Sequence, residues 1–151
     1  MTMIMEGSRS FLIEVQALNT KTIFGYPQRR ATGFDLNRLQ ILLAVISKYT
    51  KINLGAHDIY LNVVGGFKIK DTAADLAVIG AILSAYFEVP VPKQTLILGE
   101  VGLSGEVRTV SQIDKRIKEA ERLGFQNFLV ADHKKANSIN NINEIIKLFK
   151  K

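Results

Sequence analysis

The sequence predicts a single mixed α/β domain, of the α+β sandwich class. Three observations lead to this prediction: strand-like and helix-like segments are mixed along the chain, apolar residues make up 47% of it, and no Pro- or Gly-rich linker divides it. A chain of 151 residues has the length of one domain and can fill a single core. We therefore interpret residues 1–151 as one compact unit, of which only the extreme ends look dispensable.

In the first half of the chain, two predicted strands flank a helix. Residues 11–18 are largely apolar and residues 58–64 alternate, which is typical of strands. Leu36–Tyr49 repeats apolar residues at helical spacing, and Asp35 is placed to cap its first turn. The polar connection over residues 19–35 is long, which indicates either a β-ribbon or a functional loop.

The second half begins with the most apolar segment. Residues 73–87 are apolar nearly all round, which predicts a helix buried in the middle of the domain and closed by Pro90 and Pro92. The remaining predictions are a hairpin over 95–102 and 106–110, a surface helix over 112–123, a short buried strand over 127–131 and a last helix over 141–149. The cations expected to face outward from the surface helix are Lys115, Arg116, Lys118 and Arg122.

The chain is basic, and its charge is unevenly distributed. Twenty Lys and Arg residues outnumber 14 Asp and Glu residues, for a net charge of +6. This balance favours an anionic partner, with nucleic acid the leading candidate. Between residues 21 and 51 the only acidic residue is Asp35. The basic residues of that segment are Lys21, Arg29, Arg30, Arg38, Lys48 and Lys51.

Several classes of site are excluded by composition. The chain contains no Cys, so it forms no disulfide and no thiolate zinc site. Its two histidines, His57 and His133, lack ligand spacing, and we expect no metal site. The longest apolar run, residues 76–87, is shorter than the roughly 20 residues of a membrane span, and Met1–Gly7 does not have the pattern of a signal peptide.

Two segments resemble the proteolytic domain of Lon-type peptidases. They are VVGGFKIKDTAADLAV, over residues 63–78, and LGEVGLSGEVRTVSQIDKRIKEAERLGFQNFLV, over residues 98–130. In that family a Ser at the start of a buried helix and a Lys on a later helix form the catalytic dyad. Aligned on these landmarks, Ala73 falls at the Ser position and Asp114 at the Lys position. Because neither side chain can supply the dyad's chemistry, the resemblance implies a Lon-like fold without peptidase activity.

Local interpretations compete with these assignments. Ser111 and Asp114 have the spacing of a capping box, which would explain the carboxylate without any catalytic ancestry. Asp75, the only charge in the buried helix, can satisfy free N–H groups at the helix start.

An active peptidase with a different nucleophile is an alternative. Ser104 or Ser111, paired with Lys115 or Lys118, would be its candidates. Both serines lie where hydroxyl groups usually serve local hydrogen bonds, in a turn and at a helix start. The sequence around neither serine carries a signal of activation.

From end to end, the chain resembles the C-terminal domain of the bacterial RadA (Sms) family more closely. The matching segments are EGSRSFLIEVQAL, FGYPQRRATGFDLNRLQILLAVISKYTKINL and DIYLNVVGGFKIKDTAADLAV, which begin at Glu6, Phe24 and Asp58. The family's Glu-Pro-Ala-Ala-Asp-Leu-Ala appears here as Asp71-Thr72-Ala73-Ala74-Asp75-Leu76-Ala77. The first two positions differ, whereas the Ala at the former nucleophile position is kept.

This resemblance implies a C-terminal piece of a larger RecA-like ATPase, a branch-migration helicase that acts with RecA in DNA repair and recombination. It implies a bacterial cytoplasmic, nucleoid-associated protein. The family's Cys-rich zinc motif, Walker motif and Lys-Asn-Arg-Phe-Gly segment do not occur in this chain. ATP, Mg and Zn are therefore expected only of the upstream domains, and no cofactor is expected here.

For this domain, the resemblance implies assembly into a homohexameric ring and contact with single-stranded or branched DNA. The alternative is a purely structural scaffold that holds the ring together while the ATPase core makes every DNA contact.

The expected DNA-binding residues combine cations with aromatic rings, a composition that suits phosphates and exposed bases. They are Lys21, Phe24, Tyr26, Arg29, Arg30 and Arg38 in the first basic segment, and Lys68 and Lys70 beside the former active site. Lys134 and Lys135 are secondary candidates. In the alternative interpretation, Phe24 and Tyr26 pack into the core or against a neighbouring subunit.

Overall fold

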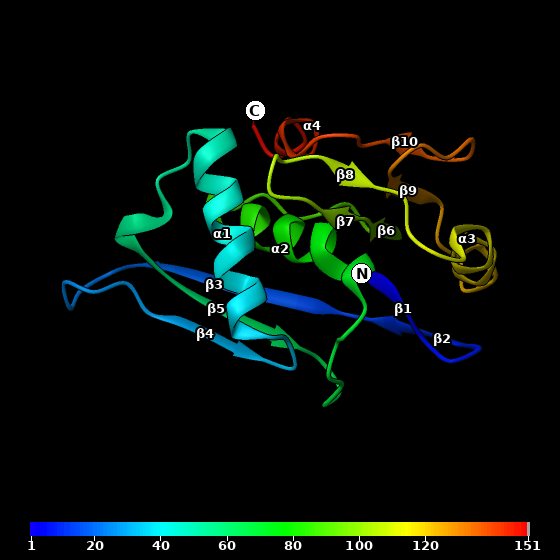
Figure 1. Cartoon of the computed structure of the whole chain (residues 1–151), viewed down its shortest axis with the longest axis horizontal. Helices are drawn as coiled ribbons and strands as arrows, with labels where there is room; N and C mark the ends of the chain where they lie inside the picture. Colours follow the sequence, from blue (N-terminus) through cyan, green and yellow to red (C-terminus); the bar gives the residue numbers. More distant parts are fainter. Residues whose placement is uncertain (151) are drawn as a thin grey trace.

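Helix α2 (Asp75–Phe87) is the centre of the fold, and the other elements pack around it (Figure 1). The structure is a computed structural model that describes residues 1–150. On one side of α2 lies a sheet of β3 (Val15–Lys21), β5 (His57–Val63) and β4 (Arg29–Thr32), in that order. β3 is antiparallel to β5, whereas β4 is parallel to it.

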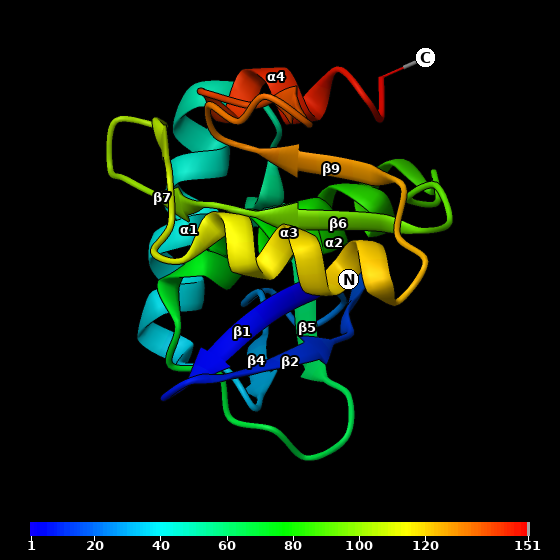
Figure 2. The ribbon, with the colours of Figure 1, turned by 90° about the vertical axis from the view of Figure 1, so that its right-hand side faces the viewer.

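A second sheet lies on another side of α2 and is all parallel. Its order is β10 (Asn137–Ser138), β9 (Asn127–Val130) and β6 (Thr95–Leu98). Two hairpins complete the strands: β1 (Thr2–Glu6) with β2 (Arg9–Ile13), and β7 (Glu100–Val101) with β8 (Val107–Arg108). Figure 2 shows β1 between the two sheets, on the side that α3 (Ile113–Arg122) covers.

The remaining helical elements are α1 (Leu36–Thr50), α4 (Ile142–Ile146) and two short 3₁₀ turns, η1 (Leu54–Ala56) and η2 (Thr72–Ala74). This architecture confirms the predicted mixed α/β class, whereas its specific likeness to Lon stays a prediction. No helix within residues 1–150 has both the length and the apolar character that crossing a membrane requires.

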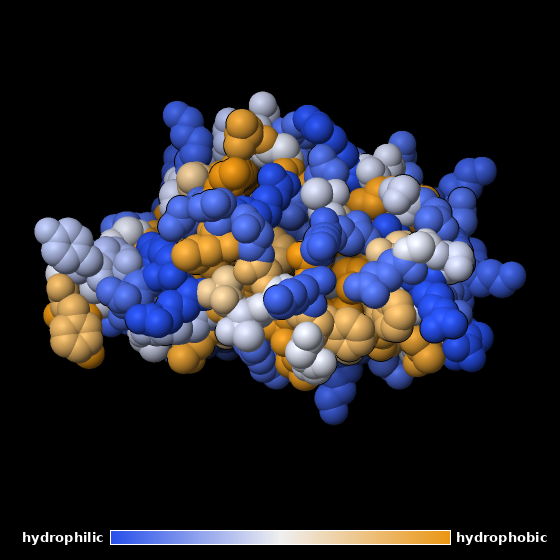
Figure 3. Space-filling model, turned by 60° about the horizontal axis from the view of Figure 1, so that its bottom comes forward, coloured by the Kyte–Doolittle hydropathy of each residue, from blue (hydrophilic) through white to orange (hydrophobic). Residues whose placement is uncertain are grey.

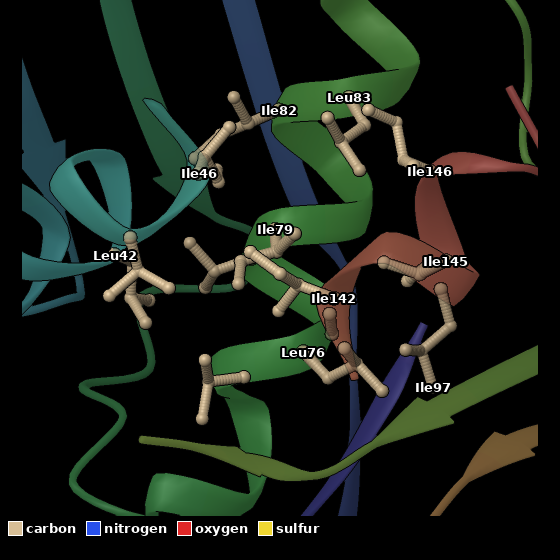
Figure 4. Close-up of a cluster of buried hydrophobic side chains, with 14 of the residues drawn as sticks. Leu42, Ile46, Leu76, Ile79, Ile82, Leu83, Ile97, Ile142, Ile145 and Ile146 are labelled. Carbon is tan, nitrogen blue, oxygen red and sulfur yellow. The ribbon is translucent and has the colours of Figure 1, made fainter. Parts of the chain in front are cut away.

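The core confirms the predicted burial of α2. Leu76, Ile79, Ile82 and Leu83 are completely buried on one broad face of the helix, and Ala77 and Val78 are buried on the other sides. Figure 4 shows what surrounds them: Leu42 and Ile46 from α1, Ile97 from β6, and Ile142, Ile145 and Ile146 from α4. Apolar contact on every side explains why the α2 segment carries no polar stripe.

The N-terminal segment is not dispensable, so that prediction was wrong. Thr2, Met3 and Ile4 of β1 are fully buried, and the carbonyl of Met1 accepts a hydrogen bond from Ile97 N–H at 3.0 Å. β1 is covered on both faces, so its sequence lacks the alternation by which a half-buried strand is found.

Two predicted strands are interrupted. The segment 11–18 divides at Glu14 into β2 and β3, and the segment 95–102 divides at Gly99 into β6 and β7. At Gly99 the backbone bonds the start of α2: its N–H donates to Ala73 O at 2.9 Å and its carbonyl accepts from Leu76 N at 3.0 Å. A Cβ at this position would lie 2.5 Å from Val107 Cγ1, so only glycine permits this approach.

Arg116 is buried, contrary to its predicted outward orientation. Only 1% of it is exposed, and its guanidinium donates to Met3 O at 2.6 Å, Asp71 Oδ2 at 2.7 Å and Ser111 O at 2.9 Å. The other oxygen of Asp71 caps the η2 turn by accepting from Ala73 N at 3.0 Å. Arg116 and Asp71 therefore tie α3 and β1 to the turn that leads into α2.

The buried pair predicts a large stability difference between two arginines of α3. Removing Arg116 leaves Asp71 unpaired in a mostly buried setting, so we expect Arg116→Ala to lower the free energy of unfolding by about 3–5 kcal/mol. The control is Arg122→Ala, which removes an exposed cation paired with Glu119 and should cost less than about 1 kcal/mol. Urea denaturation measures both, and equal losses would contradict the structural role of Arg116.

The same pair predicts a pH dependence. Burial alone would raise the pKa of Asp71, but hydrogen bonds from Arg116, Met5 N and Ala73 N outweigh it and hold that pKa below its ordinary value of 3.8. The stabilisation is therefore complete above pH 3.8 and is lost as the pH falls through the lower, folded-state pKa. We expect the free energy of unfolding to fall less steeply with acidification in Asp71→Asn than in the wild type. Denaturant melts at a series of pH values measure this, and equal slopes of the unfolding free energy against pH in the two proteins would rule it out.

Candidate nucleic-acid interface

Loop 22–28 connects β3 to β4 and projects from one end of the molecule (Figure 1, left). Its two ends meet at one carboxylate: Asp58 Oδ1 on β5 accepts from Thr22 Oγ1 at 2.8 Å and from Gln28 N at 2.7 Å. The bond from Gln28 N–H, followed by that from the Thr22 hydroxyl, holds the pKa of Asp58 below its ordinary value. Backbone bonds from Thr22 N to Ala56 O and from Ile59 N to Gln28 O, both 2.9 Å, close the same base.

The tip of this loop exposes three large hydrophobic side chains. Ile23, Phe24 and Tyr26 are 85%, 79% and 83% exposed. Figure 3 brings the underside of the molecule forward, and apolar side chains project at its far left end. The aromatic residues therefore do not pack into this chain's own core, so that half of the alternative interpretation was wrong, while packing against a neighbouring subunit stays a prediction. Three large apolar side chains held together in solvent form a candidate binding surface.

Two of the predicted DNA-binding arginines are occupied by their own chain. Arg29 donates to three backbone carbonyls, those of Gln28 at 3.0 Å, Leu54 at 2.8 Å and His57. Burial lowers the pKa of Arg29, against the opposing influence of Asp58. Three of the five N–H groups of its guanidinium are therefore engaged at the base of the loop.

Arg38 forms a two-pronged ion pair with Asp75. Its Nε donates to Asp75 Oδ1 at 3.1 Å, its Nη2 donates to Asp75 Oδ2, and Nη2 also reaches Val101 O at 2.9 Å. Burial raises the pKa of Asp75, while the bonds from Arg38 and Val101 N–H act in the opposite direction. Asp75, the only charge in the buried helix, thus has a partner in Arg38. A buried carboxylate requires such a partner, so Asp75 was the sequence signal for the role of Arg38.

The other predicted cations are exposed but do not form one cluster. Within residues 1–150, no hydrogen bond or ion pair engages the side chain of Lys21, Arg30, Lys68 or Lys70. Lys21 pairs in register with His57, the first residue of β5, whereas Lys68 and Lys70 come after Val63, its last residue. At the usual rise per residue, the two ends of β5 are about 20 Å apart. Arg30 lies between them, beside Tyr60 in the register.

The secondary candidates differ from each other. Lys134 is exposed, whereas Lys135 forms an ion pair with Glu121 at 2.9 Å.

The two positions aligned with the Lon dyad do not meet. Ala73 is fully buried among Met3, Leu96 and Ile117, whereas the Asp114 side chain is 92% exposed and lies 3.0 Å from His133 Nε2. The α3 cation nearest the Ala73 turn is Arg116, which reaches it through Asp71. The alignment of Ala73 and Asp114 with the Lon dyad stays a prediction.

The capping box predicted for α3 is not formed. The N-cap residue is Gln112, in a left-handed conformation, and no side chain caps the first turn. The backbone carbonyl of Ser111 is bonded by Arg116 Nε instead. Asp114 does lie in the first turn, where its charge suits the helix dipole.

The alternative peptidase dyads are not assembled either. In the part of the chain that the structure describes, neither the Ser104 nor the Ser111 hydroxyl is hydrogen-bonded to a Lys, His or carboxylate. Lys115 donates to the carbonyl of Ser8, and Lys118 lies on the exposed side of α3. Across residues 1–150, no three His, Asp or Glu side chains converge as metal ligands would.

Fold and site together define a mixed α/β domain with an exposed aromatic loop. Residues 14–134 match the ChlI family, described as subunit ChlI of Mg-chelatase, and the chain belongs to this family.

Its sequence is also similar to proteins named DNA repair protein RadA. The relative from Aquifex aeolicus is 50% identical over 125 residues, those from Bacillus subtilis and Campylobacter jejuni are 46% and 45% identical over 129 and 127 residues, and the matches cover 83–85% of this chain. The chain spans 28% of the length of each of these relatives.

The loop geometry predicts that Asp58→Ala will free loop 22–28. Without either carboxylate oxygen, the Thr22 hydroxyl and Gln28 N–H lose their common acceptor, which typically costs about 1–3 kcal/mol and should increase local opening roughly 5- to 150-fold. Chymotryptic cleavage after Phe24 measures this opening under native conditions. Asp114→Ala, at a carboxylate on α3 that is 92% exposed, is the control, and equal cleavage rates in the two variants would contradict the role of Asp58.

Proposed function

We propose that this chain is a DNA-contacting, non-proteolytic domain of a RadA-type DNA repair and recombination ATPase. The observation that carries the proposal is the clamped loop 22–28, which holds Phe24 and Tyr26 in solvent next to uncompensated cations. The proposal follows the relatives named DNA repair protein RadA, because their identity of 45–50% extends over more than four fifths of the chain.

The contact would combine two kinds of interaction. Arg30 and Lys21, whose side chains are free, would pair with phosphates, and the rings of Phe24 and Tyr26 would stack on unpaired bases. Single-stranded or branched DNA suits this arrangement because its bases are accessible. Such binding is driven largely by phosphate charge, so it depends on salt and reads little sequence.

The domain would have no peptidase activity. Burial of Ala73, the absence of any nucleophile at that position and the engagement of Arg116 by three oxygen atoms support this part of the proposal. The methyl group of Ala73 cannot attack a peptide carbonyl. The hydroxyl next to it in the turn, that of Thr72, donates to Glu100 Oε2 at 2.6 Å.

Assembly into a ring, as a hexamer, is the second part of the proposal. It is supported by a largely apolar recess of about 360 Å³ on the exposed side of α1, lined by Ile41, Ala44, Val45, Lys48, Tyr49 and Leu103. ATP hydrolysis, with its Mg and Zn requirements and the cooperation with RecA, would belong to other parts of the longer protein. A ring would set several weak DNA contacts on one strand and strengthen them by avidity.

The proposal predicts that Arg30→Ala weakens binding of a fluorescent single-stranded oligonucleotide. Loss of one phosphate contact should reduce the slope of log K against log salt by about 0.7, whereas Arg122→Ala, which removes the same charge from α3, should leave the slope unchanged. Phe24→Ala should weaken binding roughly 5- to 150-fold through loss of one base stack. Fluorescence anisotropy at several salt concentrations measures each effect.

Sedimentation velocity of the same mixtures separates this proposal from a scaffold. A ring that carries the oligonucleotide at low salt and releases it at higher salt would support DNA contact. A ring that never sediments with the oligonucleotide would leave assembly as the function of this chain.

A further inference from the structure

The β3–β5–β4 sheet has one face covered by helices and one face open to solvent. Val15, Ala17, Ala31, Ile59 and Leu61 point toward α1 and α2, where they join the core. Because side chains alternate along a strand, the intervening residues point the other way. Those that line the open face are Gln16, Leu18, Arg30, Thr32, Tyr60 and Asn62.

The strand register sets these side chains in two rows across the open face. Leu18, Tyr60 and Arg30 are direct neighbours on β3, β5 and β4, and so are Gln16, Asn62 and Thr32. The rows surround a hollow of about 570 Å³. Leu18 is 58% exposed, although it lies in the middle of a strand. An apolar side chain, an aromatic ring and a cation therefore lie side by side, with two amides and a hydroxyl next to them.

One cation of this face is free to bond an anionic ligand. Asp58 is the only acidic residue in the three strands; Thr22 and Gln28 donate to its carboxylate, and the charge of Arg29 lies near it. Glu14, just before β3, accepts from Gln16 Nε2 at 2.8 Å. Within residues 1–150 the Arg30 guanidinium is bonded to no carboxylate and to no carbonyl. Phosphate is a ligand that a free guanidinium can bind with two parallel N–H groups.

The polar groups of the face favour a nucleobase over an apolar protein surface. An apolar partner would bury the amides of Gln16 and Asn62 and the Arg30 guanidinium without hydrogen bonds, which is costly. A base offers donors and acceptors at its edge and a π-face for the ring of Tyr60. The face is also continuous with loop 22–28, because β3 leads directly into the loop and the loop leads into β4.

We propose that the open face of the β3–β5–β4 sheet is a second stacking surface for single-stranded DNA, on which one base stacks on Tyr60 while Arg30 holds an adjacent phosphate. It rests on the proposed function and extends it, since it assigns base contacts to residues outside loop 22–28. A single strand would run from the aromatic tip onto the sheet, with Gln16 and Asn62 bonding the edge of the stacked base.

Two substitutions at Tyr60 test the proposal. Tyr60→Ala removes the ring, and we expect the affinity for a fluorescent oligothymidylate to fall roughly 5- to 150-fold, the range for one base stack. Tyr60→Phe keeps the ring and should bind within about twofold of the wild type. Circular dichroism and urea denaturation check that both variants fold. Ultraviolet crosslinking to a thymidylate strand should recover the peptide that contains Tyr60.

The outcomes separate this proposal from the one on which it rests. If the wild type binds DNA and Phe24→Ala weakens binding while Tyr60→Ala does not, the sheet face is not a base contact and the proposed function stands. If the wild type binds no DNA, both proposals fail. If Tyr60→Ala changes only the sedimentation of the chain, the face is an interface between copies and the stacking proposal is overturned.

Discussion

The turn around Ala73 is held from both sides by guanidinium–carboxylate pairs, and the arrangement of the helices depends on them. Asp71 precedes the turn and binds Arg116 from α3, while Asp75 follows it and binds Arg38 from α1. The same arginines reach backbone carbonyls of β1 and β7. Each carboxylate also accepts backbone N–H groups, so charges that would be costly to bury alone are fully bonded.

These pairs divide the cations of the chain into two groups. Arg29, Arg38 and Arg116 are bonded to carbonyls or carboxylates of their own chain and serve the fold. Arg30 and Lys21 are left to the surface, next to a loop and a sheet face that the core does not need. A basic composition therefore overstates how much charge is available to a partner.

The loop and the sheet face share a rigid foundation. Asp58 belongs to β5, the central strand of the sheet, and it closes the loop whose tip carries Phe24 and Tyr26. A loop whose base is bonded before a ligand arrives loses less backbone entropy on binding than an open loop, which favours affinity. The same geometry would serve a strand of nucleic acid that extends from the tip onto the sheet.

The sequence by itself determined the mixed α/β class, the start of α1 after Asp35, the burial of most of α2 and the strand at β5, because each depends on residues close together in the chain. Only the tertiary structure decided which cations are free. Arg38 and Asp75 are 37 residues apart and Arg116 and Asp71 are 45 apart, so no local pattern pairs them. The breaks at Glu14 and Gly99 and the burial of β1 likewise arise from packing between distant segments.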